Sequence, residues 1–148
     1  MLRIRRILCA SDFSRTSGKA LAAAISLAKS SRAGLTILYS YVPIVPLVPE
    51  QYIDSRTWDR VDTETRRWAE RQIAKLAARA KKGGVRASAM MVTGDPALQI
   101  VRAARSVRAD LIVMGTHGRR GVSKFFLGSV AERVIATAPC PVLTVRGK

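Results

Sequence analysis

The residues of this sequence best suited to bind a ligand form a glycine-punctuated loop in its C-terminal third. Directly after the apolar run at residues 111–114, the loop begins with Gly115-Thr116-His117-Gly118, and nine residues later it reaches Gly128-Ser129. Since glycine has no Cβ, it can take a positive φ and lets a ligand approach the main chain. A helix opening at Ser129, with the Ser129 hydroxyl as its cap, would offer unpaired N–H groups and the positive end of its dipole. The pattern predicts a site for a phosphate chain.

Better-known nucleotide loops do not fit this spacing. A Walker loop needs glycine, four residues and then Gly-Lys-Ser/Thr, and the dinucleotide fingerprint needs G-x-G-x-x-G after the first strand. Neither pattern occurs in this sequence. The observed pattern, G-x-x-G followed by nine residues and G-S, resembles the ATP-binding signature of the universal stress protein family. The alternative is that these glycines are plain turn residues between a strand and a helix.

Three other segments carry the same resemblance along the chain. Residues 7–14 look like the family's first strand and its Asp-containing turn, residues 94–96 look like the start of its third helix, and residues 138–145 are similar to its closing strand. The segments occur in the expected order. The resemblance therefore implies one universal stress protein domain over residues 1–148, a length suited to one substantial core.

Alternating strand and helix patterns predict the fold class. Short connections between them require a parallel sheet with helices on both faces, because each crossover is right-handed and covers a face. The resemblance implies a doubly wound, Rossmann-like α/β fold with five strands in the order 3-2-1-4-5, whose ligand crevice lies between the first and fourth strands. The expected strands are residues 4–10, 35–40, 85–92, 111–114 and 142–145.

A long helix is predicted over residues 54–82, because Gly83-Gly84 provides a C-terminal stop. Asp95-Pro96 predicts the start of the next helix, since Asp caps free N–H groups and Pro suits the first turn. The apolar positions expected along the long helix are Trp58, Val61, Trp68, Ile73, Leu76 and Ala80.

The resemblance implies a crevice with a carboxylate facing the phosphate-binding loop. Asp12 is then the residue for the ribose hydroxyls or for a metal ion, although a cap on the following helix is an equally open role for it. The base is expected beside Ser40, which stands where the family commonly has a small apolar residue that bonds through its main chain. The nucleotide-binding set is Ala10, Asp12, Ser40, Met114, Gly115, His117, Gly118, Arg119, Gly128, Ser129 and Val130.

The ligand that the resemblance implies is ATP, with Mg²⁺ at Asp12 as a second component. A general-base role for His117 is not favoured, because no orienting partner can be named, and this histidine is expected to line the phosphate site or face water. Arg119, Arg120 and Lys124 either close over a triphosphate or lie in solvent. With no residue to position attacking water, ATP hydrolysis is expected to be slow at most. The sequence thus predicts a stress sensor or regulator.

The net charge supports a second hypothesis. The chain has 26 Lys and Arg against 10 Asp and Glu, a formal +16, with six of the acids between Glu50 and Glu70. A nucleic-acid binder is the alternative, but the scattered basic residues, the few aromatics and the lack of a known motif argue against it as the main function. Weak, salt-sensitive association with nucleic acid is still expected. A nucleotide-free interaction scaffold is a third reading, against which the glycine signature argues.

Location and assembly follow from simpler signals. No apolar run approaches the roughly 20 residues that cross a bilayer, and the basic N-terminal segment precedes too short an apolar stretch for a signal peptide, so a cytoplasmic protein without membrane contact is expected. Cys9 and Cys140 match no metal or redox spacing and are expected to be buried free thiols. The resemblance implies a homodimer through residues 142–145, whose strand edge would otherwise expose unpaired backbone groups.

Overall fold

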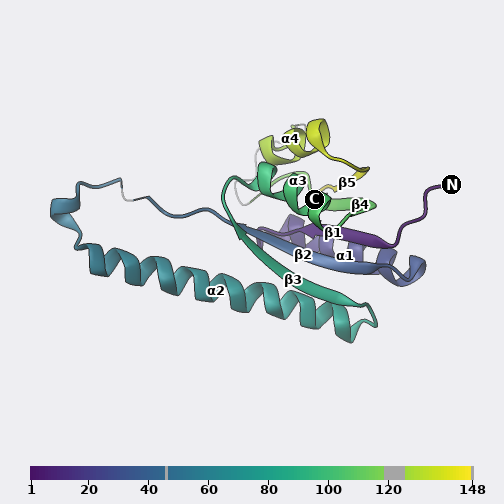
Figure 1. Ribbon diagram of the computed structural model, residues 1–148, viewed down its shortest axis with the longest axis horizontal. Helices are drawn as coiled ribbons and strands as arrows, with labels where there is room; N and C mark the ends of the chain where they lie inside the picture. Colours follow the sequence, from purple (N-terminus) through teal and green to yellow (C-terminus); the bar gives the residue numbers. More distant parts are fainter. Residues whose placement is uncertain (46, 119–125, 148) are drawn as a thin grey trace.

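The computed structural model describes residues 1–45, 47–118 and 126–147. Its centre is a five-stranded sheet in the order β3-β2-β1-β4-β5 with all neighbours parallel (Figure 1). The predicted fold and strand order are therefore confirmed. The strands are β1 (Arg6–Ala10), β2 (Gly34–Tyr41), β3 (Ala87–Thr93), β4 (Leu111–Gly115) and β5 (Val142–Val145).

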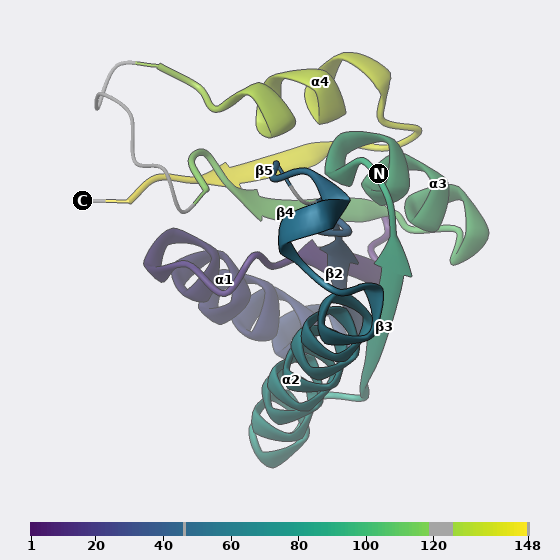
Figure 2. The same cartoon turned by 90° about the vertical axis from the view of Figure 1, so that its left-hand side faces the viewer.

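Helices cover both faces of this sheet. Figure 2 shows α1 and α2 on one side of the strands and α3 and α4 on the other. The sheet winds in two directions from β1, and right-handed crossovers that run in opposite directions along the sheet place their helices on opposite faces. The helices are α1 (Arg15–Ser31), α2 (Ser55–Lys82), α3 (Pro96–Ser106) and α4 (Ser129–Thr137), with a short 3-10 helix, η1 (Glu50–Tyr52).

The two cores follow from the alternation of side chains along β1. Ile7 and Cys9 pack into the core under α1 and α2, whereas Leu8 and Ala10 pack into the core under α3 and α4. All four are buried, as expected of a central parallel strand covered on both faces. Packing in these two cores holds the carboxyl ends of the strands in place, and the pocket described below lies at those ends.

The burial of α2 differs from the sequence prediction. Its second half is packed through residues such as Ile73, but Val61 and Trp68, two of the apolar positions expected along it, are 41% and 40% exposed. The reason is visible in Figure 1, where the first half of α2 extends past the carboxyl ends of the strands. Tyr41 attaches this half to the sheet, because its hydroxyl donates to Asp62.

An ion pair joins the start of α3 to the middle of α4. Asp95 caps α3, since its Oδ2 accepts the N–H of Leu98 at 3.0 Å. The Arg133 guanidinium on α4 donates to both carboxylate oxygens of Asp95, each at 2.9 Å. The hydrogen bonds from Arg133, and after them the one from Leu98, hold the pKa of Asp95 below its usual value. The pair links the N-cap of α3 to the middle of α4, on the same face of the sheet.

We expect Arg133→Met to remove this link and to lower Tm by a few degrees only, because solvent-exposed ion pairs contribute little to stability. Since the folded-state pKa of Asp95 is depressed, the contribution is present above the unfolded pKa of about 3.9 and is lost as pH falls through the lower folded-state pKa. Thermal unfolding followed by circular dichroism at neutral and acid pH measures the difference from wild type.

Arg102→Met is the matched control, because it removes an exposed arginine from α3 that takes no part in the pair. The wild type and Arg133→Met should converge in acid. A Tm difference that stays constant as Asp95 becomes protonated, or an equal effect of Arg102→Met, would contradict the assignment.

Candidate functional site

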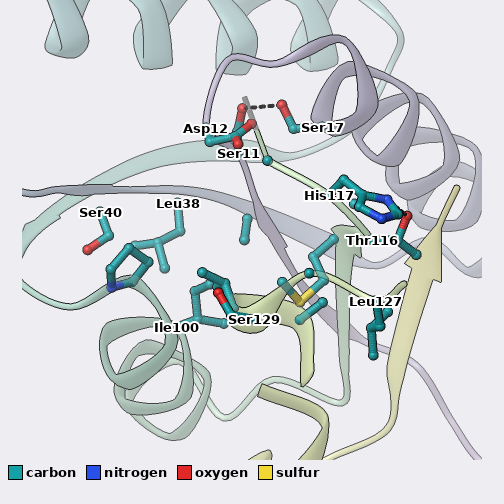
Figure 3. A pocket seen from close by; sticks show the side chains of 18 of the residues that line it. Ser11, Asp12, Ser17, Leu38, Ser40, Ile100, Thr116, His117, Leu127 and Ser129 are labelled. Carbon is teal, nitrogen blue, oxygen red and sulfur yellow. Dashed lines mark hydrogen bonds between the residues drawn. The ribbon is translucent and has the colours of Figure 1, made fainter. Parts of the chain in front are cut away.

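A pocket of about 580 Å³ opens at the carboxyl ends of β1, β2 and β4 (Figure 3). The first turns of α3 and α4, the turn before α1 and the loop after β4 complete its wall. β1 lies between β2 and β4, so the pocket is at the point where the winding of the sheet reverses. Parallel α/β sheets bind their ligands at this place.

Most of the residues expected to bind nucleotide are brought together here. Arg119 lies outside the described residues, as do Arg120 and Lys124. All the others line the pocket: Ala10, Asp12, Ser40, Met114, Gly115, His117, Gly118, Gly128, Ser129 and Val130.

Sequence reasoning missed much of the apolar wall and three hydroxyl residues. In Figure 3, Leu38, Ser40 and Ile100 lie at one end of the pocket, and Thr116 and His117 lie at the other. Leu38 could have been found from its place two residues before Ser40 on the same strand face, whereas nothing local marks Ile100. The missed lining residues are Ser11, Ser17, Leu38, Tyr39, Pro96, Ile100, Thr116, Phe126, Leu127 and Ala131.

Asp12 belongs to the turn between β1 and α1. Its Oδ1 accepts the N–H of Ser14 at 2.9 Å. Ser14, in turn, is the N-cap of α1, because its hydroxyl oxygen accepts the N–H of Ser17 at 3.1 Å. The two open roles of Asp12 are thereby separated: Ser14 caps the helix, and Asp12 shapes the turn that precedes the cap and lines the pocket.

The three loop glycines are required by close contacts. A Cβ at Gly115 would lie 2.8 Å from Thr16 Cγ2, one at Gly118 would lie 2.8 Å from Asp12 Oδ2, and one at Gly128 would lie 2.6 Å from the Thr116 carbonyl oxygen. None of the three has a positive φ, so the expectation of left-handed conformations was wrong here. The loop instead folds tightly over the start of α1, which leaves no room for side chains.

The start of α4 lacks a side-chain cap. Gly128, not Ser129 as expected, is the N-cap, and no side chain bonds to the first turn among the described residues. Ser129 is the first helical residue, since the N–H of Gly128 donates to the Thr116 carbonyl at 2.6 Å and draws the chain back before the helix begins. The next residues, Val130 and Ala131, also line the pocket. The positive dipole end of α4 and its first-turn N–H groups, to which no side chain bonds within the described residues, are therefore suited to an anion.

Ser40 offers its main chain to the pocket. In a strand, the peptide groups of residues two apart point to the same side. The Leu38 carbonyl accepts the N–H of Ser11 from the β1 side at 2.8 Å, and the Tyr41 carbonyl accepts the N–H of Gly94 from the β3 side at 2.9 Å. The N–H and C=O of Ser40 thus point past the end of β1. Its side chain is engaged elsewhere, because Oγ donates to the Gly94 carbonyl at 2.9 Å.

His117 lies in the phosphate loop with one of its two ring nitrogens unpaired. Nδ1 is 2.9 Å from Thr116 Oγ1, whereas Nε2 is buried and has no hydrogen-bond partner among the described residues. Buried polar atoms are normally satisfied, so an orphan atom in a pocket wall marks a place where a bound molecule or water completes the bonding. The hydrogen-bond partner of the ring in the described chain is a hydroxyl, not a carboxylate that would orient a general base.

Other functional classes find less support. Within the described residues, no three His, Cys, Asp or Glu side chains lie together as a metal site. Cys9 and Cys140 are free, and burial raises the pKa of the Cys9 thiol to about 12, which removes its reactivity. The described part of the chain contains no helix that is long and apolar enough to cross a membrane.

Comparisons with known proteins agree with this architecture over the whole chain. A universal stress protein of Thermus aquaticus is 37% identical over 142 residues, which cover 96% of this chain and 98% of that protein. Universal stress protein YxiE of Bacillus subtilis is 33% identical over 150 residues, covering 95% and 98%.

Solved structures agree as well. The structure of protein MJ0577 superposes with a TM-score of 0.83 at 26% identity, covering 99% of this chain and 98% of that one. A universal stress protein in complex with cAMP superposes with a TM-score of 0.71 at 26% identity, covering 97% and 98%. The sequence pattern of the universal stress protein family matches residues 3–146. The chain belongs to the universal stress protein family.

Proposed function

We propose that this protein binds ATP in the pocket at the carboxyl ends of β1, β2 and β4 and acts as a nucleotide-dependent regulator of a stress response. One observation carries the proposal. The first turn of α4, which has no side-chain cap within the described residues, opens into the pocket, and the loop that lines this pocket has glycine at the three positions where a Cβ would collide with neighbouring atoms. A nucleotide complex of a family relative supports it, since that protein is bound to cAMP.

The phosphates are assigned to the glycine loop and to the start of α4. The N–H groups of Ser129, Val130 and Ala131 supply donors, and the helix dipole adds a favourable field for negative charge. The orphan Nε2 of His117 is a further polar atom in the same wall. The Gly115-to-Ser129 spacing is that of the ATP-binding family signature, which is why a triphosphate is proposed.

The base is assigned to the apolar end of the pocket. Leu38 and Ile100 are 1% and 4% exposed and would flank the ring, while the main-chain N–H and C=O of Ser40 would bond to its edge. The hydroxyl of Ser40 is held by Gly94, so this serine serves through its backbone, as a small apolar residue would. Base recognition then depends on strand geometry and little on the Ser40 side chain.

The ribose is assigned to Asp12, which lies between these two ends. A carboxylate accepts hydrogen bonds from ribose hydroxyls. Mg²⁺ is compatible with this position as a bridge between Asp12 and the phosphates, because Mg²⁺ commonly takes one or two carboxylates and completes its shell with phosphate oxygens and water. The chemistry supplied there is charge neutralisation of the triphosphate.

We propose that the protein responds to the bound nucleotide and does not act mainly as an ATP-hydrolysing enzyme. The described pocket contains no group placed to orient an attacking water, since the bonded partner of His117 is Thr116 and Asp12 is committed in part to Ser14. Hydrolysis of the bound ATP is accordingly proposed to be slow at most.

Gly118→Val should abolish nucleotide binding, because the added side chain would crowd Asp12 Oδ2 and fill the mouth of the loop. For the wild type, ATP with Mg²⁺ at about 100 times its Kd should stabilise the fold by about 2.7 kcal/mol and raise Tm by about 5 to 10 °C. Differential scanning fluorimetry measures this shift, and cAMP in parallel wells tests the choice of nucleotide.

Gly18→Ala is the matched glycine control. Nothing lies within 4 Å of a Cβ at Gly18, a helical position in α1, so this variant should keep the full shift. The circular dichroism spectrum of Gly118→Val without ligand should match that of wild type. A wild type that shows no shift with either nucleotide, or a Gly118→Val variant that keeps it, would refute the proposed site.

A homodimer through β5 is the second part of the proposal. β5 pairs with β4 along one edge, and no other strand of the described chain pairs with its second edge. Leu143 in this strand is 38% exposed, and Ile135 on the neighbouring α4 is 47% exposed. An apolar surface beside an open strand edge suits pairing with a second copy.

Light scattering should give twice the 16.1 kDa chain mass for wild type. Leu143→Lys should yield monomers, because it places a charge in the contact. Leu98→Lys on α3 is the control, since Leu98 is comparably exposed, at 43%, away from β5. A monomeric wild type, or dissociation of both variants, would reject this interface.

A further inference from the structure

Arginines gather at the end of the sheet opposite the pocket. In Figure 1 this end carries the N-terminus, the turn from α1 to β2 and the turn from α2 to β3. Each arginine of the group is exposed. We call this group the amino-end surface, and its members are Arg5, Arg6, Arg32, Arg86, Arg105 and Arg108.

The parallel topology places these residues side by side. The Arg5 carbonyl accepts the N–H of Gly34 at 2.8 Å, the Arg86 carbonyl accepts the N–H of Leu35 at 2.9 Å, and the Arg6 carbonyl accepts the N–H of Asp110 at 2.8 Å. The starts of β3, β2, β1 and β4 are therefore consecutive along one edge. With strands about 4.8 Å apart, the four starts span about 15 Å.

Left-handed residues bring two more arginines to this edge. Arg32 has φ 55° and Arg108 has φ 51°, and each turns the chain from the end of a helix into the next strand. Left-handed φ is uncommon outside glycine, asparagine and aspartate. Both turns thus carry an exposed cation at a position where a small residue is the usual choice.

Negative charge is scarce on the amino-end surface. Asp110 accepts the N–H groups of Arg5 and Arg6, each at 2.9 Å, and these bonds hold its pKa below the usual value. Its carboxylate is thereby committed to the backbone. None of the six guanidinium groups forms an ion pair within the described residues. The surface therefore retains most of its positive charge.

Helix dipoles account for part of this pattern only. Cations at the C-terminal ends of helices are stabilised by the dipole, and this explains Arg105 in the last turn of α3. Arg86 also serves a helix end, because its guanidinium donates to the carbonyl of Arg32, the C-cap of α1, at 3.4 Å. Arg5 and Arg6, by contrast, precede or begin β1, where no helix end favours them. Their gathering indicates a partner outside the chain.

We propose that the amino-end surface binds the phosphate backbone of duplex DNA. The planar fork of arginine matches phosphate oxygens with two hydrogen bonds, and DNA presents one negative charge per about 1.7 Å of its axis. The aromatic contacts among the described residues involve Phe13, Tyr39 and Trp68, away from this edge, so base stacking with single strands is not provided.

A lipid surface fits less well. Membrane-bound surfaces combine cations with inserted apolar side chains. Beside this surface, Met1 and Leu2 are the exposed large apolar residues among those that the structure describes, whereas the largest group of the others lies in residues 42–52 beyond the opposite end of the sheet. The DNA assignment also stands apart from the nucleotide pocket, because the path along β2 from Gly34, at the amino-end surface, to Leu38, the first residue of the strand that lines the pocket, is about 13 Å.

The test compares two triple variants by fluorescence anisotropy with a labelled DNA duplex between about 50 and 200 mM salt. Arg5→Gln, Arg86→Gln and Arg105→Gln together remove three charges from the surface. Arg67→Gln, Arg71→Gln and Lys75→Gln remove three exposed charges from α2 and serve as the control. The surface variant should reduce the slope of log K against log salt by about 2.7, at about 0.9 per lost phosphate contact, and the control should leave it near the wild-type value.

Nucleotide binding separates this inference from the proposed function. The surface variant should keep the thermal shift with ATP, and Gly118→Val should keep the wild-type salt slope. Equal losses in the two triple variants, no binding by wild type at low salt, or tighter binding to single-stranded DNA or phosphatidylserine vesicles would overturn the proposal.

Discussion

The site depends on a tight closure of the chain between β4 and α4. The N–H of Gly128 donates to the Thr116 carbonyl at 2.6 Å, and glycine at 115 and 118 lets the same loop rest on the start of α1 and on Asp12. This closure places the first turn of α4 at the end of β4 and leaves it without a side-chain cap. A side chain at Gly128 would collide with the Thr116 carbonyl and break the closure at the start of α4, whereas side chains at Gly115 and Gly118 would collide with Thr16 and Asp12.

The parallel sheet gives the molecule two chemically different ends. Carboxyl ends of strands meet the starts of helices, whose N–H groups and positive dipoles suit a nucleotide phosphate. Amino ends of strands meet the ends of helices, and in this chain an arginine follows α1, α2 and α3, at Arg32, Arg86 and Arg108. Six of the 26 basic residues are thus gathered at the end of the sheet away from the pocket, which would let one chain carry a nucleotide and contact a polyanion separately.

Strands, their order and half of the described pocket-lining residues were predictable from the sequence, because apolar runs and the glycine pattern are local or family signals. The other features depend on tertiary contacts, which a local sequence pattern does not specify. The apolar side chain of Trp68 suggests a core position, but the residue is 40% exposed. The sequence does not indicate that the first half of α2 extends beyond the sheet. Ile100 reaches the pocket only through the packing of α3 on β2. The cap shifted from Ser129 to Gly128 because backbone dihedrals, not side-chain type, decide where the helix begins.

Backbone amides at the start of α4 are the centre of this account, and NMR observes them directly. Titration of ¹⁵N-labelled protein with ATP and Mg²⁺ should move the amide resonances of Ser129, Val130 and Ala131 strongly. The amide of Leu98, which Asp95 already satisfies in the first turn of α3, should move little. ATP binding that leaves the three α4 amides unshifted, or the absence of any shift at saturating nucleotide, would contradict the account.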